Sequence, residues 1–371
     1  MAPSKSTQSK YFEYAREVSR FAELHPESEL AKANIVPQYI LVGDQSAGKT
    51  SILCRLAGLP LGFTANGTGT RRPFEYTLIR EESCINPKIE VDSKPVTEDC
   101  LLEEMTRKNG TSGFRNQAVS VKIEWKDIAT SMIIVDMPGM KDGEDAPERM
   151  VLERLSKPGV TPVVVLDPRD MGTAHYVFKV LERASPRRNT SRIIAVVNKC
   201  DIQMSGNGEW MNAESWDQWW QGAQQKGFLH LFCVGWPNCT NRNSPDSDEQ
   251  KENLSKSFTA EESLIQQFMP QVPSARMAED WLGLRRFQEC LHKYQIKRMQ
   301  EMVQTSGQKL EAASRYLEQQ LQGCDHNYER ILRTNKSDLI FMWCKAGTQL
   351  LEGNFDPHDR AKKATLQDDV E

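Results

Sequence analysis

Short apolar runs separated by polar helical stretches predict the main elements of this chain. Pro37 precedes an apolar strand at residues 38–42, which runs into a glycine-bearing loop and a helical stretch at 52–57. Turn or helical residues follow each further apolar run, which is typical of a mostly parallel, doubly wound sheet with helices on both faces. These further buried strands are predicted at 119–125, 132–135, 163–166, 193–197 and 229–234. We therefore predict an α/β fold.

Helical periodicity flanks this alternating region on both sides. Within residues 10–25, apolar residues recur at three- and four-residue steps, which predicts a helix with one apolar stripe. From about Met277 the pattern is that of a long amphipathic helix, with apolar residues seven apart at 296, 303, 310 and 317. Because the second apolar seam is patchy, we favour packing within the chain over an intermolecular coiled coil. Residues 81–112 and 238–253 show little periodicity and are interpreted as a surface insertion and a mobile loop.

Composition excludes several classes of protein. The 47 Lys and Arg residues nearly balance the 51 Asp and Glu residues, so the chain has no overall charge that would favour nucleic acid, and no nucleic-acid partner is expected. A hydrophobic content of 39% is enough for a substantial core. The nine cysteines are odd in number and lack a Cys-x-x-Cys pair, which indicates a reducing compartment. Apolar runs far shorter than about 18 residues predict no membrane span, so we expect a cytoplasmic protein.

A phosphate-binding motif stands between the first predicted strand and helix. The sequence Gly-Asp-Gln-Ser-Ala-Gly-Lys-Thr matches the pattern Gly-x-x-x-x-Gly-Lys-Ser/Thr, whose backbone N–H groups bind phosphate oxygens. Lys49 is expected to neutralise the β- and γ-phosphates, and the Thr50 hydroxyl to bind Mg²⁺. The nucleotide-binding residues predicted here are Gly43, Asp44, Gln45, Ser46, Ala47, Gly48, Lys49, Thr50 and Ser51.

An acidic residue follows a second buried strand. Asp136 comes directly after the apolar run 132–135 and begins the sequence Asp-Met-Pro-Gly. It therefore stands at the carboxyl end of a strand, where ligands bind in open α/β sheets. We expect Asp136 to hold Mg²⁺ through water and the Gly139 N–H to contact the γ-phosphate.

A third motif predicts the base. Asn198-Lys199-Cys200-Asp201 follows the run 193–197, and the Asp201 carboxylate can accept hydrogen bonds from both N1–H and the exocyclic amine of guanine. Adenine does not offer this pair of donors. The stem of Lys199 can lie along the base, and Asn198 can tie this loop to the phosphate loop. A further base contact is expected from residues 234–238, with Asn238 as the candidate. The order of the motifs predicts a GTPase.

Three segments of the sequence together resemble the dynamin superfamily of large GTPases. They are Gly43–Ser51 as GDQSAGKTS, Gly69–Pro73 as GTRRP and Asp136–Gly139 as DMPG. The Gln-Ser-Ala-Gly-Lys loop and the Thr-Arg-Arg-Pro switch are specific to that family, whereas Asn-Lys-x-Asp is shared by most GTPases. The resemblance covers roughly residues 8–300 and implies a P-loop GTPase domain that hydrolyses GTP with Mg²⁺ as cofactor.

The resemblance also implies roles for individual residues. Thr70 matches the switch threonine that binds Mg²⁺ and holds the attacking water. Gln45 matches the residue that positions this water, and Ser46 matches one that binds a charge-compensating K⁺ or Na⁺. Gly67 falls where a backbone carbonyl completes the cation site. Family members complete this site when two GTPase domains meet, so a homodimer with dimer-stimulated turnover is expected.

The resemblance divides the chain into five parts. They are a disordered tail at 1–10, a bundle helix at 11–34, a dynamin-type GTPase domain at 35–275, C-terminal helices that begin a stalk at 276–345 and a frayed tail at 346–371. The N- and C-terminal helices are expected to form a small bundle. Membrane remodelling and a peripheral association with a membrane or microtubule are implied by family analogy only.

Alternatives stay open at this stage. The chain could instead be a GTP-regulated interaction module with slow or no hydrolysis, and an ATPase would be favoured only if Asp201→Asn left the preference for GTP unchanged. Arg71 and Arg72 are interpreted as structural ion-pair residues rather than an arginine finger. The loop at 167–171 departs from the family's usual loop, which reaches across the dimer.

Two other clusters have plain structural interpretations. The four tryptophans Trp210, Trp216, Trp219 and Trp220 are expected to pack within the fold. His230, Cys233 and Cys239 do not have the spacing of a closed zinc site, and we prefer buried thiols near a strand.

Overall fold

The computed structural model describes residues 37–61, 69–141, 143–157, 159–168, 176–184, 193–206, 208–237 and 247–321. The predicted tail at 1–10, the bundle helix at 11–34 and the tail at 346–371 lie outside these residues. The described residues from 37 to 295 belong to one compact unit, and residues 296–321 belong to another. The division into domains at 35, 276 and 346 stays a prediction.

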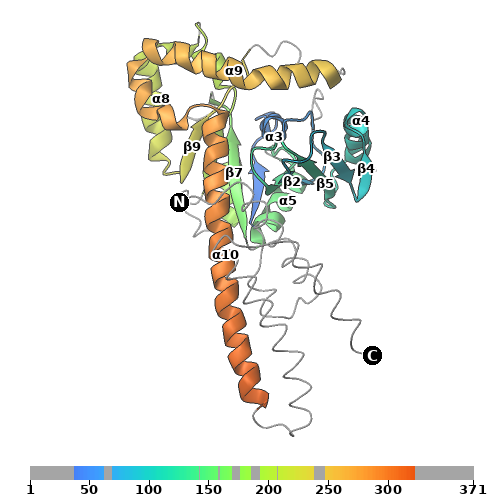
Figure 1. Ribbon diagram of the computed structural model, residues 1–371. Helices are drawn as coiled ribbons and strands as arrows, with labels where there is room; N and C mark the ends of the chain where they lie inside the picture. The colour runs from blue at the N-terminus through green and yellow to red at the C-terminus, as the bar shows by residue number, and fades with distance from the viewer. Residues whose placement is uncertain are drawn as a thin grey trace. The chain divides into compact units, whose positions relative to one another are not determined.

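Strands and helices alternate through the first of these units (Figure 1). The strands among the described residues are β1 (Gln38–Val42), β2 (Phe74–Arg80), β3 (Lys88–Val91), β4 (Lys94–Val96), β5 (Val119–Trp125), β6 (Met132–Asp136), β7 (Val160–Leu166), β8 (Ile194–Val197) and β9 (His230–Cys233). The α-helices are α3 (Lys49–Ala57), α4 (Glu98–Asn109), α5 (Asp145–Ser156), α6 (Tyr176–Ala184), α7 (Cys200–Met204), α8 (Ala213–Gln225), α9 (Ser247–Gln271) and α10 (Leu284–Leu321). Two 3₁₀ helices are η3 (Glu209–Met211) and η4 (Pro273–Trp281).

The strands form one sheet in the order β4-β3-β5-β2-β6-β1-β7-β8-β9. Strand β1 pairs in parallel with β6 and β7, and the parallel pairing continues through β8 to β9. Strand β2 is antiparallel to β6, and β3 is antiparallel to both of its neighbours. The predicted α/β fold with a mostly parallel sheet is confirmed.

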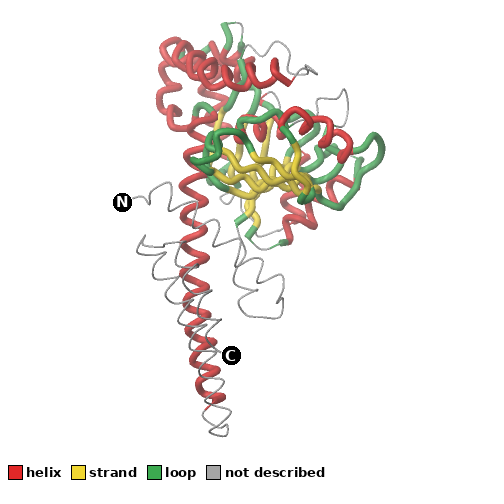
Figure 2. The backbone as a smooth tube through the Cα atoms, turned by 45° about the vertical axis from the view of Figure 1, so that its right-hand side comes forward, coloured by secondary structure: helices red, strands yellow, loops and turns green. Residues whose placement is uncertain are grey.

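Helices cover both faces of the sheet, which explains why the strands β1, β6, β7 and β8 are buried along almost their whole length (Figure 2). Successive side chains of a strand point to opposite faces. In β1, Tyr39 and Leu41 join the core layer beneath α3, α4 and the first turns of α10. Ile40 and Val42 join the opposite layer, which α5, α6, α7 and α8 cover. Every residue of β1 after Gln38 is therefore buried.

The tryptophan cluster belongs to the second of these layers. Trp216 is fully buried, and its ring stacks on that of Trp220 with centroids 5.5 Å apart. Trp210 contacts Trp216 edge to face at 5.1 Å. The prediction that these rings pack within the fold is confirmed.

Two predictions of irregular structure are wrong in part. Residues 81–112 contain β3, β4 and α4, and Ile89 of β3 and Met105 of α4 are buried. The periodicity is hidden because β3 and β4 are only four and three residues long. Residues 247–253 belong to α9 rather than to a loop, and residues 238–246 lie outside the described part of the chain.

The long amphipathic helix predicted from about Met277 is present as η4 and α10. Helix α10 runs from Leu284 to Leu321 and passes through Gly307 without a break. None of the helices that the structure describes combines the length and the apolar character needed to cross a membrane.

Candidate functional site

The sequence motifs meet at one edge of the sheet. Strands β6, β1, β7, β8 and β9 are neighbours with parallel directions, so the residues after their carboxyl ends lie along the same edge. Strand β2 runs the other way, and its first residue, Phe74, is paired with Asp136 at the end of β6. Thr70, just before β2, is thereby brought to this edge. The order of the strands reverses at β1, with β6 on one side and β7 on the other, and open α/β sheets bind ligands at such a point.

The loop between β1 and α3 has the backbone shape of an anion-binding loop. Ser46 and Gly48 both have positive φ values, 65° and 91°, and helix α3 begins at Lys49. Gly48 cannot be replaced without movement, because a Cβ there would lie 2.0 Å from Asn198 Nδ2. A Cβ on Gly43 would lie 2.4 Å from the carbonyl oxygen of Val165. Gly43 is therefore required by close approach, and Gly48 by close approach as well as by conformation.

Lys49 and Asp136 place opposite charges in the interior of this site. The Lys49 ammonium donates hydrogen bonds to the carbonyl oxygens of Gly43 and Asp44, both at 3.1 Å. Burial lowers the pKa of Lys49, while the charges of Asp136 and Asp44 oppose that shift. Burial likewise raises the pKa of Asp136, against the charge of Lys49 and hydrogen bonds from Thr50 and Thr70. Both charges are costly to bury alone, so each depends on its surroundings.

Two hydroxyl groups converge on the Asp136 carboxylate. Thr50 Oγ1 donates to Asp136 Oδ2 at 2.7 Å, and Thr70 Oγ1 donates to the same oxygen at 3.2 Å. The two hydroxyl oxygens are 3.4 Å apart. The second oxygen, Asp136 Oδ1, is buried without a hydrogen-bond partner among the described residues. Hydroxyl and carboxylate oxygens are the donors that Mg²⁺ prefers, and the unsatisfied Oδ1 fits such an ion.

The segment after Asp136 pairs with the phosphate loop. The Gln45 N–H donates to the Met140 carbonyl at 2.9 Å, and the Met140 N–H donates to the Gly43 carbonyl at 3.2 Å. A Cβ on Gly139 would lie 2.8 Å from the Cα of Gln45 and 3.3 Å from Lys49 Nζ. Gly139 is therefore a point of close backbone contact, near the Lys49 ammonium.

Asn198 and Lys199 connect the base motif to its surroundings. Asn198 Nδ2 donates to the Ala47 carbonyl at 3.1 Å, so the predicted tie to the phosphate loop is confirmed. Lys199 has a positive φ of 66° and caps helix α7. Its ammonium donates to Asp167 Oδ2 at 2.9 Å. Asp167 follows β7 directly, and this partner was not predicted, although its position at a strand end could have indicated it.

Asp201 lies against the backbone that follows β9. The Trp236 N–H donates to Asp201 Oδ1 at 3.1 Å. A Cβ on Gly235 would lie 2.6 Å from the Asp201 nitrogen, so only glycine permits this approach. The segment 234–237 thus lies against the base motif. The base contact expected from residues 234–238 stays a prediction, and Asn238 and Gly67 lie outside the described residues.

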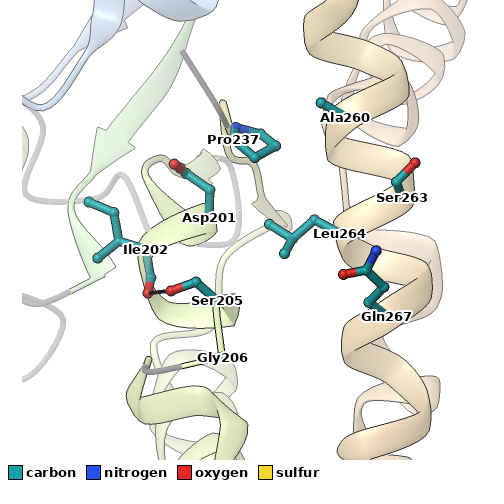
Figure 3. Close-up of a pocket in the computed structure, with 9 residues that line it drawn as sticks. All are labelled: Asp201, Ile202, Ser205, Gly206, Pro237, Ala260, Ser263, Leu264 and Gln267. Carbon is teal, nitrogen blue, oxygen red and sulfur yellow. Dashed lines mark hydrogen bonds between the residues drawn. The ribbon is translucent and has the colours of Figure 1, made fainter. Parts of the chain in front are cut away.

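A pocket of about 660 Å³ opens beside Asp201. Figure 3 shows Asp201, Ile202 and Pro237 on one side and the α9 residues Ala260 and Leu264 on the other. The lining therefore combines one carboxylate with apolar and small polar groups. Helix α9, which no sequence motif singled out, forms one wall.

The two switch arginines differ in their contacts. Arg72 is buried and donates to the main-chain carbonyls of Gln117, at 2.6 and 2.9 Å, and of Lys108, at 3.1 Å. Arg71 is held through its main chain, where its N–H donates to Asn109 Oδ1 at 2.8 Å. The fixed guanidinium of Arg72 supports a structural role, through hydrogen bonds to carbonyls rather than the expected ion pair.

The described residues give no support for a zinc site at His230 and Cys233. Among the described residues, no group of three or more His, Cys, Asp or Glu side chains is arranged to hold a metal ion. Cys233 is buried on β9, and burial lowers the pKa of His230 on the same strand. Cys239 lies outside the described residues.

Comparison with known proteins points to one family. A family model described as the dynamin family matches residues 40–200, which contain the phosphate loop, Thr70, Asp136 and Asn198. This match and the curated relatives support a dynamin-superfamily GTPase domain in this part of the chain. The match ends at residue 200, within the base motif and one residue before Asp201.

Curated relatives of this GTPase domain are distant. The dynamin-1-like protein of Danio rerio is 26% identical over 202 residues, which cover 46% of this chain and 29% of that protein. Dynamin-2 of Mus musculus and dynamin-1 of Homo sapiens are each 23% identical over 303 residues, which cover 77% of this chain and 32% or 33% of those proteins. The chain spans about a third of the length of these curated relatives.

Proposed function

We propose that this GTPase domain binds GTP together with Mg²⁺ and hydrolyses it to GDP and inorganic phosphate, and that pairing of two such domains stimulates turnover. One observation carries the proposal. The side chains of Thr50, Thr70 and Asp136 are far apart in the sequence but contact one another. They lie near Lys49 and next to a loop of anion-binding shape. This is the combination of groups that binds a metal-bound triphosphate.

The phosphates are held by the loop and its helix. The N–H groups of residues 43–51 and the N-terminus of α3 face the phosphate oxygens, and Lys49 neutralises the β- and γ-phosphates. Thr50, Thr70 and Asp136 would hold Mg²⁺, Asp136 through water, and the ion would neutralise charge on the same phosphates. The Gly139 N–H reaches the γ-phosphate, because residue 139 lies against the loop.

Hydrolysis needs a positioned water and compensation of developing charge. The water oxygen bonds to the γ-phosphorus, and the bond from that phosphorus to the β–γ bridging oxygen breaks. Of the two protons of the water, one stays on the phosphate and the other is released. Gln45 and Thr70 orient this water, and Ser46 with the carbonyl of Gly67 would bind K⁺ or Na⁺ beside the phosphates. A cation there stabilises charge that forms in the transition state.

Guanine is selected at the neighbouring loop. Asp201 accepts from N1–H and the exocyclic amine, Lys199 lies along the base, and Asn198 links this loop to Ala47 of the phosphate loop. Asn238 is the further base contact that the motif order predicts. Association with a membrane or microtubule, and a part in membrane remodelling, are carried over from the family resemblance alone.

The test is phosphate release from GTP and from ATP over a range of protein concentrations, in K⁺, in Na⁺ and in choline. We expect release from GTP only, at a rate per molecule that rises with protein concentration and requires K⁺ or Na⁺. Gln45→Ala serves as the inactive comparison. Tight GTP binding with a flat rate near zero would instead favour a GTP-regulated interaction module, and equal release from ATP would contradict guanine selection.

A further inference from the structure

A buried ion pair joins the phosphate-loop helix to the backbone near Asp201. Arg55 lies on α3, six residues after Lys49, and Glu261 lies on α9. Arg55 Nη2 is 2.7 Å from Glu261 Oε2, and the two side chains are only 2% and 4% exposed. Arg55 also lies over the rings of Trp236 and Phe258, at 5.9 and 5.2 Å from their centroids. Neither side chain belongs to a sequence motif of the site.

The pair holds one residue, Gly235, from both sides. The Gly235 N–H donates to Glu261 Oε1 at 2.6 Å, and the Gly235 carbonyl accepts from Arg55 Nη1 at 2.6 Å. That carbonyl belongs to the same planar peptide as the Trp236 N–H, which donates to Asp201 Oδ1. The carbonyl and the N–H of a trans peptide point in opposite directions, so Arg55 on one side sets the direction of the donor to Asp201 on the other.

The Glu261 carboxylate has a complete set of donors. It accepts from the Gly235 N–H, from both terminal nitrogens of Arg55 and from the Leu284 N–H at 2.9 Å, where α10 begins. Ser257 Oγ adds a contact to Arg55 Nε at 3.2 Å. A carboxylate fits four donors, whereas an amide would turn its own N–H groups toward at least one of them.

We propose that the Arg55–Glu261 pair is a positioning device for guanine recognition, which orients the Asp201 carboxylate through the peptide between Gly235 and Trp236. The proposal rests on the proposed function, in which Asp201 contacts the base. Asp201 needs both oxygens in the plane of the base to accept two hydrogen bonds, and the Trp236 N–H restrains that plane. Neither Arg55 nor Glu261 touches the nucleotide itself.

The test compares GDP with inosine diphosphate, which lacks the exocyclic amine. Neither nucleotide has a γ-phosphate, so binding is measured without hydrolysis. Isothermal titration calorimetry gives both dissociation constants for the full chain with Mg²⁺. We expect the wild-type protein to bind GDP about tenfold more tightly, since one hydrogen bond to a charged acceptor is lost with inosine. Glu261→Gln is expected to lower this preference to about twofold or less. A purely structural role would weaken both ligands equally and leave the ratio unchanged.

A matched control lies at the next position. Glu262 pairs with Arg285 at 2.9 Å on the exposed side of α9, and Glu262→Gln should leave the ratio at its wild-type value. Breaking a buried pair destabilises a fold, whereas replacing both partners with apolar groups is often tolerated. If Glu261→Gln does not fold, the double variant Arg55→Met with Glu261→Leu keeps the test open, and it should also lose the preference.

The outcomes separate the two proposals. A wild-type preference that persists in folded Glu261→Gln or in the double variant overturns the positioning role and leaves guanine contact by Asp201 standing. No preference in the wild-type protein overturns guanine contact by Asp201, and the positioning role with it.

Discussion

The phosphate side and the base side of the site are built differently. On the phosphate side, Lys49, Thr50 and Asp136 contact one another or the loop directly, and two buried charges lie in the middle. On the base side, each motif residue is held by a partner from elsewhere, as Lys199 is by Asp167 and Asp201 by Trp236. Loss of a group should therefore abolish chemistry on the first side and weaken selectivity on the second.

The largest effect is expected at Lys49. Lys49→Met keeps the length of the side chain but removes the charge that faces the phosphates, so GTP hydrolysis should fall by about 10³-fold. Burial already opposes this charge, but its removal also leaves the buried Asp136 carboxylate without a counter-charge, so the variant should be folded and less stable than the wild-type protein. Phosphate release and circular dichroism measure the two properties. Full activity in the folded variant would contradict a role of Lys49 in neutralising the phosphates.

The next effect separates chemistry from binding within the phosphate loop. Gln45→Ala and Ser46→Gly should each lower turnover by about 10²-fold, while the dissociation constant for GTP changes only severalfold. Glycine suits position 46, because its φ of 65° lies in the left-handed region. Single-turnover hydrolysis and nucleotide titration give the two quantities. An equal loss in both would assign these residues to binding instead.

On the base side, Asp201→Asn should remove the choice of guanine. Two hydrogen bonds to a charged acceptor are lost, so GTP affinity should fall by about 10²-fold and the preference over ATP should disappear. Competition of GTP and ATP for the same site measures the preference. An unchanged preference would contradict guanine selection by Asp201 and favour an ATPase.

The smallest effect is expected at Asp167, which contacts a motif residue rather than the base. Asp167→Asn weakens the hold on Lys199, and the dissociation constant for GDP should rise by about threefold to tenfold. Glu104→Gln, which changes an exposed pair with Arg107 within α4, is the control and should have no effect. A loss of affinity as large as that expected for Asp201→Asn would contradict the supporting role of Asp167 on the base side.

The sequence was sufficient to predict those parts of the candidate site that consist of contiguous motifs. Residues 43–50 require glycine and a small hydroxyl residue at set positions, because backbone geometry and metal binding are local demands. The strands β1, β6, β7, β8 and β9 were equally predictable, since strands buried on both faces are mostly apolar. Strand β5 was predicted as well, although its buried residues alternate with less buried ones. The phosphate loop and the strands that lead into the motifs could therefore be located from the sequence alone.

Only the tertiary structure revealed what holds the base loop in place. Arg55 and Glu261 are 206 residues apart, and Asp167 and Lys199 are 32 apart, with no pattern that pairs them. Strands β2, β3 and β4 were also missed, because short or half-exposed strands carry too little periodicity. By itself the sequence determined the phosphate-loop motif at residues 43–50, because the demands on that motif are local. The folded sheet decided which distant side chains orient the base loop, because such contacts depend on how strands and helices stack.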